Sequence, residues 1–286
     1  MRTEMDAAED MFKVSGSSGI SGKAVRKVVF VVGAPRSGTS IVWLALRNAL
    51  NSSRYGESHM MPFFASQAKR IRQDFCGLSG RKFAGTLAAE TAPITLEAHF
   101  LNMVRSFYNE AYHGANIVDK TANLHAVKAI PFTRRVFPSA VFIFCRRRAI
   151  ENVASRLRKW PNQSFESHCQ WWTNVMSEWR SLRINLPEKT YREVDQHVIA
   201  TRPAEAAQSL AEVMQLDWEE NNLVLNTFRT AEASMIEGSK KERVLDLDCI
   251  DWDADRKRVF LEICGEELAA WGYTLDGTYC REKGRS

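Results

Sequence analysis

Three features that mark other classes of protein are missing from this sequence. No apolar run approaches the roughly 20 residues that a membrane-spanning helix needs. Residues 1–26 are polar and rich in Ser and Gly, with no apolar core of signal-peptide length. None of the six cysteines belongs to a C-x-x-C pair, which argues against a zinc site or a redox motif. We therefore expect a cytoplasmic protein with free thiols, no membrane partner and no metal.

The excess of basic residues is also small. The 286 residues include 39 Lys and Arg against 34 Asp and Glu, a net charge of +5. This balance favours anionic ligands without requiring nucleic acid. A basic cluster at 146–159 could form a nucleic-acid patch, but it lacks the interleaved aromatic residues of such surfaces, and we expect no nucleic-acid partner.

Apolar runs rich in β-branched residues alternate with segments of helical periodicity. Strands are predicted at 28–33, 116–121 and 140–145, and a turn-rich connection at 51–64. Helical patterns cover 38–50, 86–109, 149–160, 164–183, 203–216 and 255–273. This alternation predicts an α/β fold with a parallel sheet. No linker interrupts residues 27–275, so we expect one domain over 27–286 after a flexible tail at 1–26.

The stretch GAPRSGTS, at 33–40, joins the first predicted strand to a helix. Such a loop points backbone N–H groups at an anion, although a plain turn between a strand and a helix remains an alternative. The spacing is nearly that of the nucleotide-binding loop G-x-x-x-x-G-K-[ST], but Thr39 replaces the lysine. Arg36 can supply the missing positive charge from within the loop. A nucleotide kinase would also need an Asp for Mg²⁺, and the only candidate, in IVDK at 117–120, is poor.

The loop resembles the 5′-phosphosulfate loop of sulfotransferases that use 3′-phosphoadenosine 5′-phosphosulfate (PAPS). A second motif strengthens the resemblance. In that family a strand ends in an Arg and a Ser follows eight residues later, and both bind the 3′-phosphate of the donor. The sequence FIFCRRRAIENVASRLR places Arg147 and Ser155 at this spacing, which selects Arg147 from the three consecutive arginines. The usual Pro two residues after the Arg is Ala149 here. Weaker likenesses, DKTANL and LAAWGYTL, extend the match over about 28–275.

The resemblance implies a three-layer, P-loop-like fold with a central parallel sheet. It also implies transfer of a sulfonate group from PAPS to a hydroxyl or amine, which yields adenosine 3′,5′-bisphosphate. The implied donor-binding residues are Arg36, Ser37, Gly38, Thr39, Ser40, Arg147 and Ser155. Arg36, the amides of 37–40 and Lys120 would stabilise charge on the leaving phosphate without a metal.

The group that takes the acceptor's proton is less well defined by the sequence. In the cytosolic branch of the family a His follows a Lys-Thr pair, but Ala122 follows Lys120-Thr121 here. The branch with a glutamate base places it in a loop after the first helix, and RYGESHMMPFF resembles that loop. Glu57 is therefore our candidate for the catalytic base, while His59, Glu90 and Glu97 remain alternatives.

The sequence thus predicts a PAPS-dependent sulfotransferase that acts on a small-molecule or carbohydrate acceptor. A nucleotide-dependent kinase and a nucleotide- or nucleic-acid-binding module without catalysis are the alternatives. The crowded tryptophans could stack an acceptor ring, but Trp172 and Trp179 are seven residues apart and form one helical stripe, which favours core packing.

Overall fold

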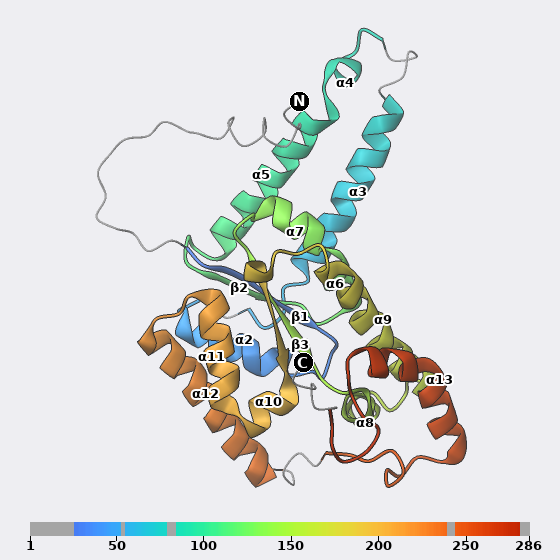
Figure 1. Ribbon diagram of the computed structural model, residues 1–286. Helices are drawn as coiled ribbons and strands as arrows, with labels where there is room; N and C mark the ends of the chain where they lie inside the picture. The colour runs from blue at the N-terminus through green and yellow to red at the C-terminus, as the bar shows by residue number, and fades with distance from the viewer. Residues whose placement is uncertain (1–25, 53–54, 79–83, 239–243, 281–286) are drawn as a thin grey trace.

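The computed structural model describes residues 26–52, 55–78, 84–238 and 244–280 (Figure 1). The predicted N-terminal tail lies outside these residues, apart from Arg26.

Four parallel strands form the centre of the molecule. They are β1 (Val28–Gly33), β2 (Ile117–Lys120), β3 (Val141–Arg146) and β4 (Tyr191–Asp195), in the order β2-β1-β3-β4. The α/β fold with a parallel sheet is confirmed. Because parallel strands share one direction, the residues that follow β1, β2 and β3 meet at one edge of the sheet. These are the segments that hold the predicted site residues.

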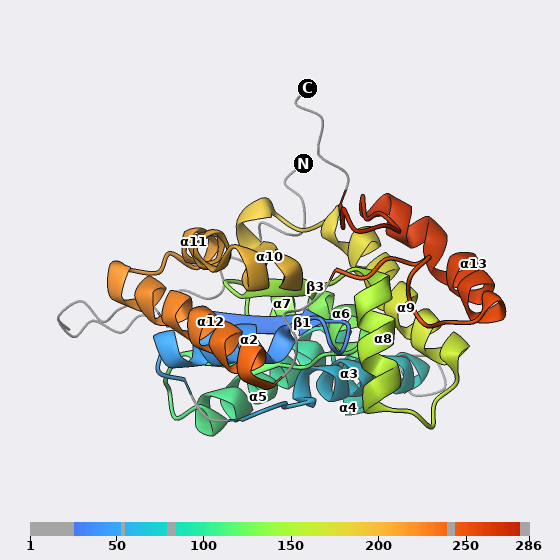
Figure 2. The same cartoon turned by 90° about the horizontal axis from the view of Figure 1, so that it is seen from below.

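Each face of the sheet supports its own apolar core. Val29 and Val31 of β1 pack into the core beneath α2 (Thr39–Ala49), α11 (Pro203–Met214) and α12 (Trp218–Gly238). Phe30 and Val32 alternate with them and face the second core. Figures 1 and 2 show α11 and α12 together on one side of the molecule and α9 and α13 on the other. The sheet is therefore the middle of three layers, as predicted.

The described residues form further helices. They are α3 (Met60–Leu78), α4 (Leu87–Glu90), α5 (Pro93–Ala111), α6 (Leu124–Lys128), α7 (Ile130–Val136), α8 (Ala149–Lys159), α9 (Phe165–Arg183), α10 (Gln196–Thr201) and α13 (Ala254–Ala270), with a 3₁₀ turn at Glu188–Thr190. The helix expected over 86–109 is two helices, because Pro93 begins a new one.

The prediction of a loop over 51–64 was wrong in its second half, because α3 begins at Met60. Pro62, which reads as a helix breaker, lies in the first turn of α3, where its missing N–H costs no hydrogen bond. Helices α8, α9, α11 and α13 lie close to their predicted positions, whereas the sequence analysis also missed β4, α6, α7, α10 and α12. β4 has a polar sequence, YREVD, and its strand conformation depends on pairing with β3.

Helices α3 and α5 form a long hairpin that projects away from the sheet, with α4 at its far end (Figure 1). We call α3, α4 and α5 together the helical hairpin. Its first helix starts three residues after Glu57, so the candidate catalytic base lies where the hairpin joins the sheet.

Candidate active site

The turn between β1 and α2 requires glycine at both ends. A Cβ on Gly33 would lie 2.3 Å from the carbonyl oxygen of Cys145, and Gly38 has a φ of 84°. Gly38 caps α2 without a side-chain hydrogen bond, and the first turn of α2 contains no acidic residue. The first amides of α2 therefore lack a side-chain cap and suit an anion.

Arg36 connects this loop to the end of the neighbouring strand. Its Nε donates to Ser155 Oγ at 3.0 Å, and Nη1 of Arg147 donates to the carbonyl oxygen of Arg36, also at 3.0 Å. Ser155 lies on α8, and Arg147 lies between β3 and α8. The two sequence motifs, more than a hundred residues apart, are thus in direct contact.

The two neighbours of Arg147 have structural partners instead. Arg148 is fully buried, pairs with Glu151, and donates to the carbonyl groups of Thr274, Asp276 and Leu245. Arg146 lies 3.6 Å from a carboxylate oxygen of Asp195 and stacks over Trp271. Among the three consecutive arginines, Arg147 is therefore the one whose side chain donates to the loop.

The sequence analysis overlooked Asn152. Its side-chain amide donates to the carbonyl oxygen of Pro35 at 2.9 Å and to Ser37 Oγ at 3.0 Å. Asn152 precedes Ser155 by three residues, so both lie on the face of α8 that contacts the loop. That helical spacing was the available signal. Through these two hydrogen bonds Asn152 stabilises the conformation of the loop.

Lys120, at the end of β2, bridges the loop and the candidate base. Its Nζ donates to Ser40 Oγ at 3.1 Å and lies 3.1 Å from Glu57 Oε1. The side chain is only 8% exposed and lies against the ring of Trp43. A buried ammonium between the loop and a carboxylate can stabilise negative charge on either side.

Glu57 is the only one of the three candidate glutamates that contacts Lys120. Its side chain is 38% exposed, so an acceptor can reach it. Nε2 of His59 lies 3.1 Å from Glu57 Oε2, which makes His59 a neighbour of the same carboxylate. Glu97 pairs with Arg135, whose hydrogen bond lowers the pKa of Glu97, and Glu90 lies on α4 at the far end of the hairpin (Figure 1).

The segment that bears Glu57 is fixed by hydrogen bonds to β2 and its end. The backbone N–H of Ser58 donates to the carbonyl oxygen of Lys120, and that of His59 donates to Thr121 Oγ1. Ser58 Oγ and the hydroxyl of Tyr108 donate to Asp119 Oδ2 at 2.5 and 2.7 Å. Burial raises the pKa of Asp119. Asp119, the aspartate of IVDK, is therefore buried and accepts hydrogen bonds from two protein side chains.

The tryptophans of α9 have different environments. Trp172 and Trp179 are fully buried, which confirms the core-packing interpretation, whereas Trp171 is partly exposed.

In the described part of the chain no group of three or more His, Cys, Asp or Glu side chains could hold a metal ion. None of the helices in the same residues is long and apolar enough to cross a membrane.

Comparison with known proteins identifies the family. A family model described as "Sulfotransferase family" matches residues 28–220, which is more than half of the chain. This chain belongs to the sulfotransferase family. The match covers the loop, Lys120, Arg147 and Ser155. A search of curated proteins found no match.

Solved sulfotransferases share the fold. The sulfotransferase domain of the Synechococcus PCC 7002 olefin synthase aligns with a TM-score of 0.56 and 13% identity, covering 91% of this chain and all of that domain. Sulfotransferase STF9 from Mycobacterium avium aligns with a TM-score of 0.50 and 15% identity, covering 89% of this chain and 79% of that protein. At such low identity the likeness establishes the P-loop-like fold and carries no information about the acceptor.

Proposed function

We propose that this sulfotransferase uses PAPS as donor and transfers its sulfonate to a hydroxyl or amine of a small-molecule or carbohydrate acceptor. The contact between Arg36, Ser155 and Arg147 is the main support. PAPS carries a phosphosulfate and a separate 3′-phosphate, so its site needs two basic anion sites at a fixed separation. Two strand-to-helix junctions of one sheet, joined by these hydrogen bonds, meet that need.

The donor-binding side of the site consists of the loop and the start of α8. Ser37, Gly38, Thr39 and Ser40 would present backbone amides to the phosphosulfate, and Arg36 would add a guanidinium. Arg147 and Ser155 would bind the 3′-phosphate. In sulfonate transfer the leaving group is a phosphate, and Arg36 and Lys120, which contact Ser155 and Ser40, would stabilise its developing charge.

The acceptor side of the site begins at Glu57. Its carboxylate would accept the proton that the acceptor hydroxyl or amine loses as the bond to sulfur forms. Lys120 contacts both Glu57 and Ser40 of the loop, so it links the proton acceptor to the donor site. The product of the donor would be adenosine 3′,5′-bisphosphate.

Thermal unfolding with two nucleotides tests the donor assignment. A ligand that binds only the folded state stabilises it by about 2.7 kcal/mol at a hundred times its Kd. Adenosine 3′,5′-bisphosphate should therefore raise the Tm, and AMP, which lacks the 3′-phosphate, should raise it far less at equal concentration. Equal shifts would contradict the assignment of Arg147 and Ser155.

Transfer from radiolabelled PAPS to fractionated metabolites then tests the reaction itself. Labelled product should form in the presence of excess EDTA, because Arg36 and Lys120 supply the positive charge. ATP turnover that depends strictly on added Mg²⁺, without sulfonate transfer, would instead identify a kinase.

A further inference from the structure

The helical hairpin contains an apolar groove that the reaction centre does not use. It has a volume of about 380 Å³ and lies between α3 and α5. Its apolar lining includes Ala68, Ile71 and Phe75 from α3 and Pro93, Leu96 and Phe100 from α5. We call this cavity the hairpin groove. Its volume falls within the range of about 300–1,000 Å³ that is usual for small-molecule sites.

The groove is formed by the facing sides of the two helices. Residues 68, 71 and 75 recur at intervals of three and four, so they form one stripe along α3. Residues 93, 96 and 100 form the matching stripe along α5. Two such stripes ordinarily interdigitate and exclude a cavity. Here they enclose one, which leaves apolar surface available to a ligand.

The charges beside the groove favour an uncharged occupant. Arg72 and Glu97 also line it, and Glu97 pairs with Arg135. The lining itself thus holds one basic and one acidic group, both Arg72 and Arg135 act on Glu97, and the remaining lining is hydrocarbon. A charged ligand would lose hydration without gaining a counter-ion, whereas an alkyl chain would gain free energy in proportion to the area buried.

One helix, α3, leads from the reaction centre to the groove. This helix begins three residues after Glu57, and Ala68 lies eight residues beyond its first residue, about 12 Å at 1.5 Å per residue. Phe64 occupies the interval, with its ring centroid 6.4 Å from that of Phe100. Phe63 and Phe107 add exposed aromatic surface nearby. Apolar side chains thus follow α3 from the candidate base to the groove.

We propose that the hairpin groove binds an apolar chain of the acceptor, so that the acceptor is an amphiphile whose hydroxyl reaches Glu57 while its alkyl chain lies between α3 and α5. This inference rests on the proposed function for the hydroxyl end only. Binding of the chain itself can be measured without any sulfonate transfer.

The first experiment measures binding by calorimetry. The probes are n-alkyl β-glucosides from butyl to dodecyl, below the concentrations at which they form micelles, with glucose as the head-group control. Affinity should rise with chain length by up to about fourfold per methylene that enters the groove. Ala68→Trp, which fills the groove, should abolish the increase. Phe75→Ala, which enlarges it, should shift the best chain length upward.

A control variant separates the groove from general effects of the substitutions. Ala204→Trp introduces the same side chain at an exposed position on α11, on the other side of the molecule, and should bind every glucoside as the wild type does. Circular dichroism and Tm identify any variant that fails to fold. Because Ala68→Trp and Phe75→Ala change the cavity in opposite directions, their opposite shifts cannot result from lost stability alone.

The second experiment measures transfer from labelled PAPS to the same glucosides. kcat/KM should rise with chain length in the wild type and stay flat in Ala68→Trp. Chain-dependent binding without transfer, either to these glucosides or to the fractionated metabolites, would contradict the proposed function and leave the groove assignment standing. Transfer that is equal for all chain lengths, together with chain-independent binding, would overturn the groove assignment and leave the proposed function standing.

Another occupant would give a different result. If two copies of the chain cover each other's groove, light scattering should show a dimer that Ala68→Trp converts to a monomer, while affinity for the glucosides stays independent of chain length. That result would also overturn the proposal.

Discussion

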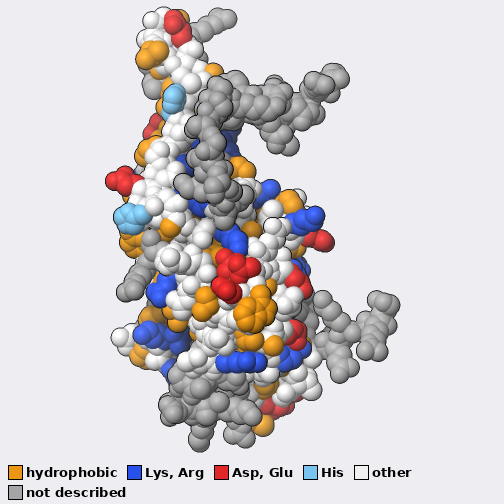
Figure 3. Space-filling model, turned by 90° about the vertical axis from the view of Figure 1, so that its left-hand side faces the viewer, with side chains coloured by type: hydrophobic (Ala, Val, Ile, Leu, Met, Phe, Trp, Pro, Cys, Tyr) orange, Lys and Arg blue, Asp and Glu red, His pale blue; other side chains and the backbone are white. Residues whose placement is uncertain are grey.

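The two sides of the candidate site differ in how tightly they are packed. In the core that supports the donor side, Phe144 of β3 and Trp179 of α9 stack with their ring centroids 4.4 Å apart and are fully buried. On the hairpin, Leu87 is 83% exposed and Ile94 is 70% exposed. Figure 3 shows hydrophobic side chains at the surface near the end of the hairpin. The donor side is therefore specified by a packed core, and the hairpin leaves apolar surface free for a ligand.

Glu57 lies at the junction between these two regions. Its contact with Lys120 ties it to the donor loop, and the chain enters α3 three residues later. A catalytic base at such a junction can meet different acceptors without any change on the donor side. The same fold can then serve different acceptors through changes in the hairpin alone.

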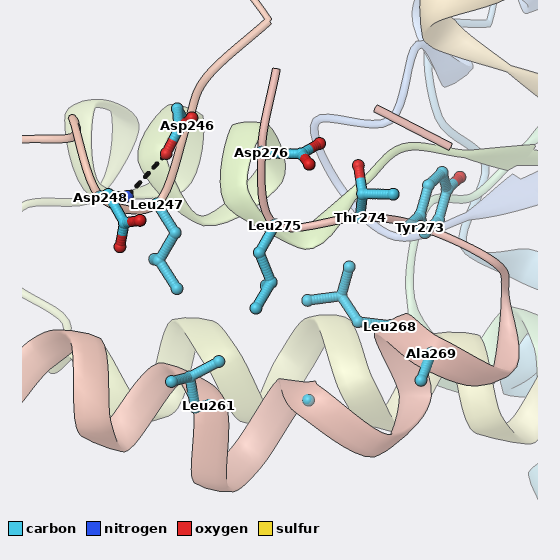
Figure 4. A pocket seen from close by; sticks show the side chains of 11 residues that line it. Asp246, Leu247, Asp248, Leu261, Leu268, Ala269, Tyr273, Thr274, Leu275 and Asp276 are labelled. Atoms are coloured by element: carbon cyan, nitrogen blue, oxygen red, sulfur yellow. Dashed lines mark hydrogen bonds between the residues drawn. The ribbon is translucent and has the colours of Figure 1, made fainter. Parts of the chain in front are cut away.

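The body of the molecule also contains a pocket, and it is larger than the hairpin groove. A larger pocket of about 510 Å³ lies on the body between α13 and residues 273–276 (Figure 4). Leu261, Leu268 and Leu275 point into it, and Asp246, Asp248 and Asp276 lie along it. We assign it no ligand, because two of its carboxylates already accept hydrogen bonds from neighbouring backbone amides.

The largest expected effect is the loss of kcat when Glu57, at the junction between the two regions, is replaced. Glu57→Gln keeps the shape of the side chain but removes a carboxylate that can accept a proton. We expect kcat to fall by about 10²–10⁴, the usual contribution of general acid–base catalysis. Affinity for adenosine 3′,5′-bisphosphate, measured by calorimetry, should barely change.

Two controls accompany this variant. Glu90→Gln, on α4, should keep normal kcat, and His59→Asn should cost much less than Glu57→Gln. The reverse ranking of Glu57 and His59 would assign the base to His59. Normal kcat in both Glu57→Gln and His59→Asn would show that the catalytic base lies outside this segment.

The second prediction compares the stability of the two regions. Trp179→Ala should lower the free energy of unfolding by about 3–5 kcal/mol, because it leaves a cavity in the packed core. Ile94→Ala, at an exposed position on the hairpin, should change it by less than about 0.5 kcal/mol. Urea unfolding of both variants measures the difference. Similar losses would mean that the hairpin is packed as tightly as the body.

The third prediction concerns the donor side alone. Arg147→Ala should remove a charge-assisted contact worth about 1.5–3 kcal/mol, which is roughly a 10–150-fold loss of affinity for adenosine 3′,5′-bisphosphate. Arg158→Ala, an exposed arginine on the same helix, is the matched control and should have little effect. Calorimetry measures both affinities. Equal losses of affinity in the two variants would contradict a specific 3′-phosphate site and indicate a diffuse basic surface.

The smallest effect is a dependence of stability on pH. Burial, followed by the nearby Arg156 guanidinium, lowers the pKa of His168. The unfolded state, with a histidine pKa near 6.5, then binds the proton more readily than the folded state. The stability that neutral His168 contributes is present above that value and is lost as the pH falls through its lower folded pKa.

Urea midpoints at about pH 7.5 and about pH 5.5 measure this effect. The difference between them should be smaller in His168→Gln than in the wild type. Burial also lowers the pKa of His197, so part of the dependence should remain. If the difference between the two urea midpoints is the same in His168→Gln as in the wild type, the pH dependence arises from other groups.

Much of the donor side could be predicted from the sequence because its signals are local. The glycines of the loop, the spacing from Arg147 to Ser155, and the buried apolar strands each appear within a short stretch of chain. Asn152 was missed because its role depends on a contact with Pro35 and Ser37, more than a hundred residues away. β4 was missed because a polar strand is stabilised by its neighbour rather than by its own composition.

The sequence by itself thus determined the parallel α/β fold, the loop and the two motifs around the proposed donor site, because periodicity and spacing along the chain encode them. Only the tertiary structure decided that Arg147 and Ser155 contact the loop residue Arg36 and which glutamate contacts Lys120. It also determined that α3 and α5 enclose a groove. The physical reason is that each depends on side chains from separate segments, and packing alone sets the distance between them.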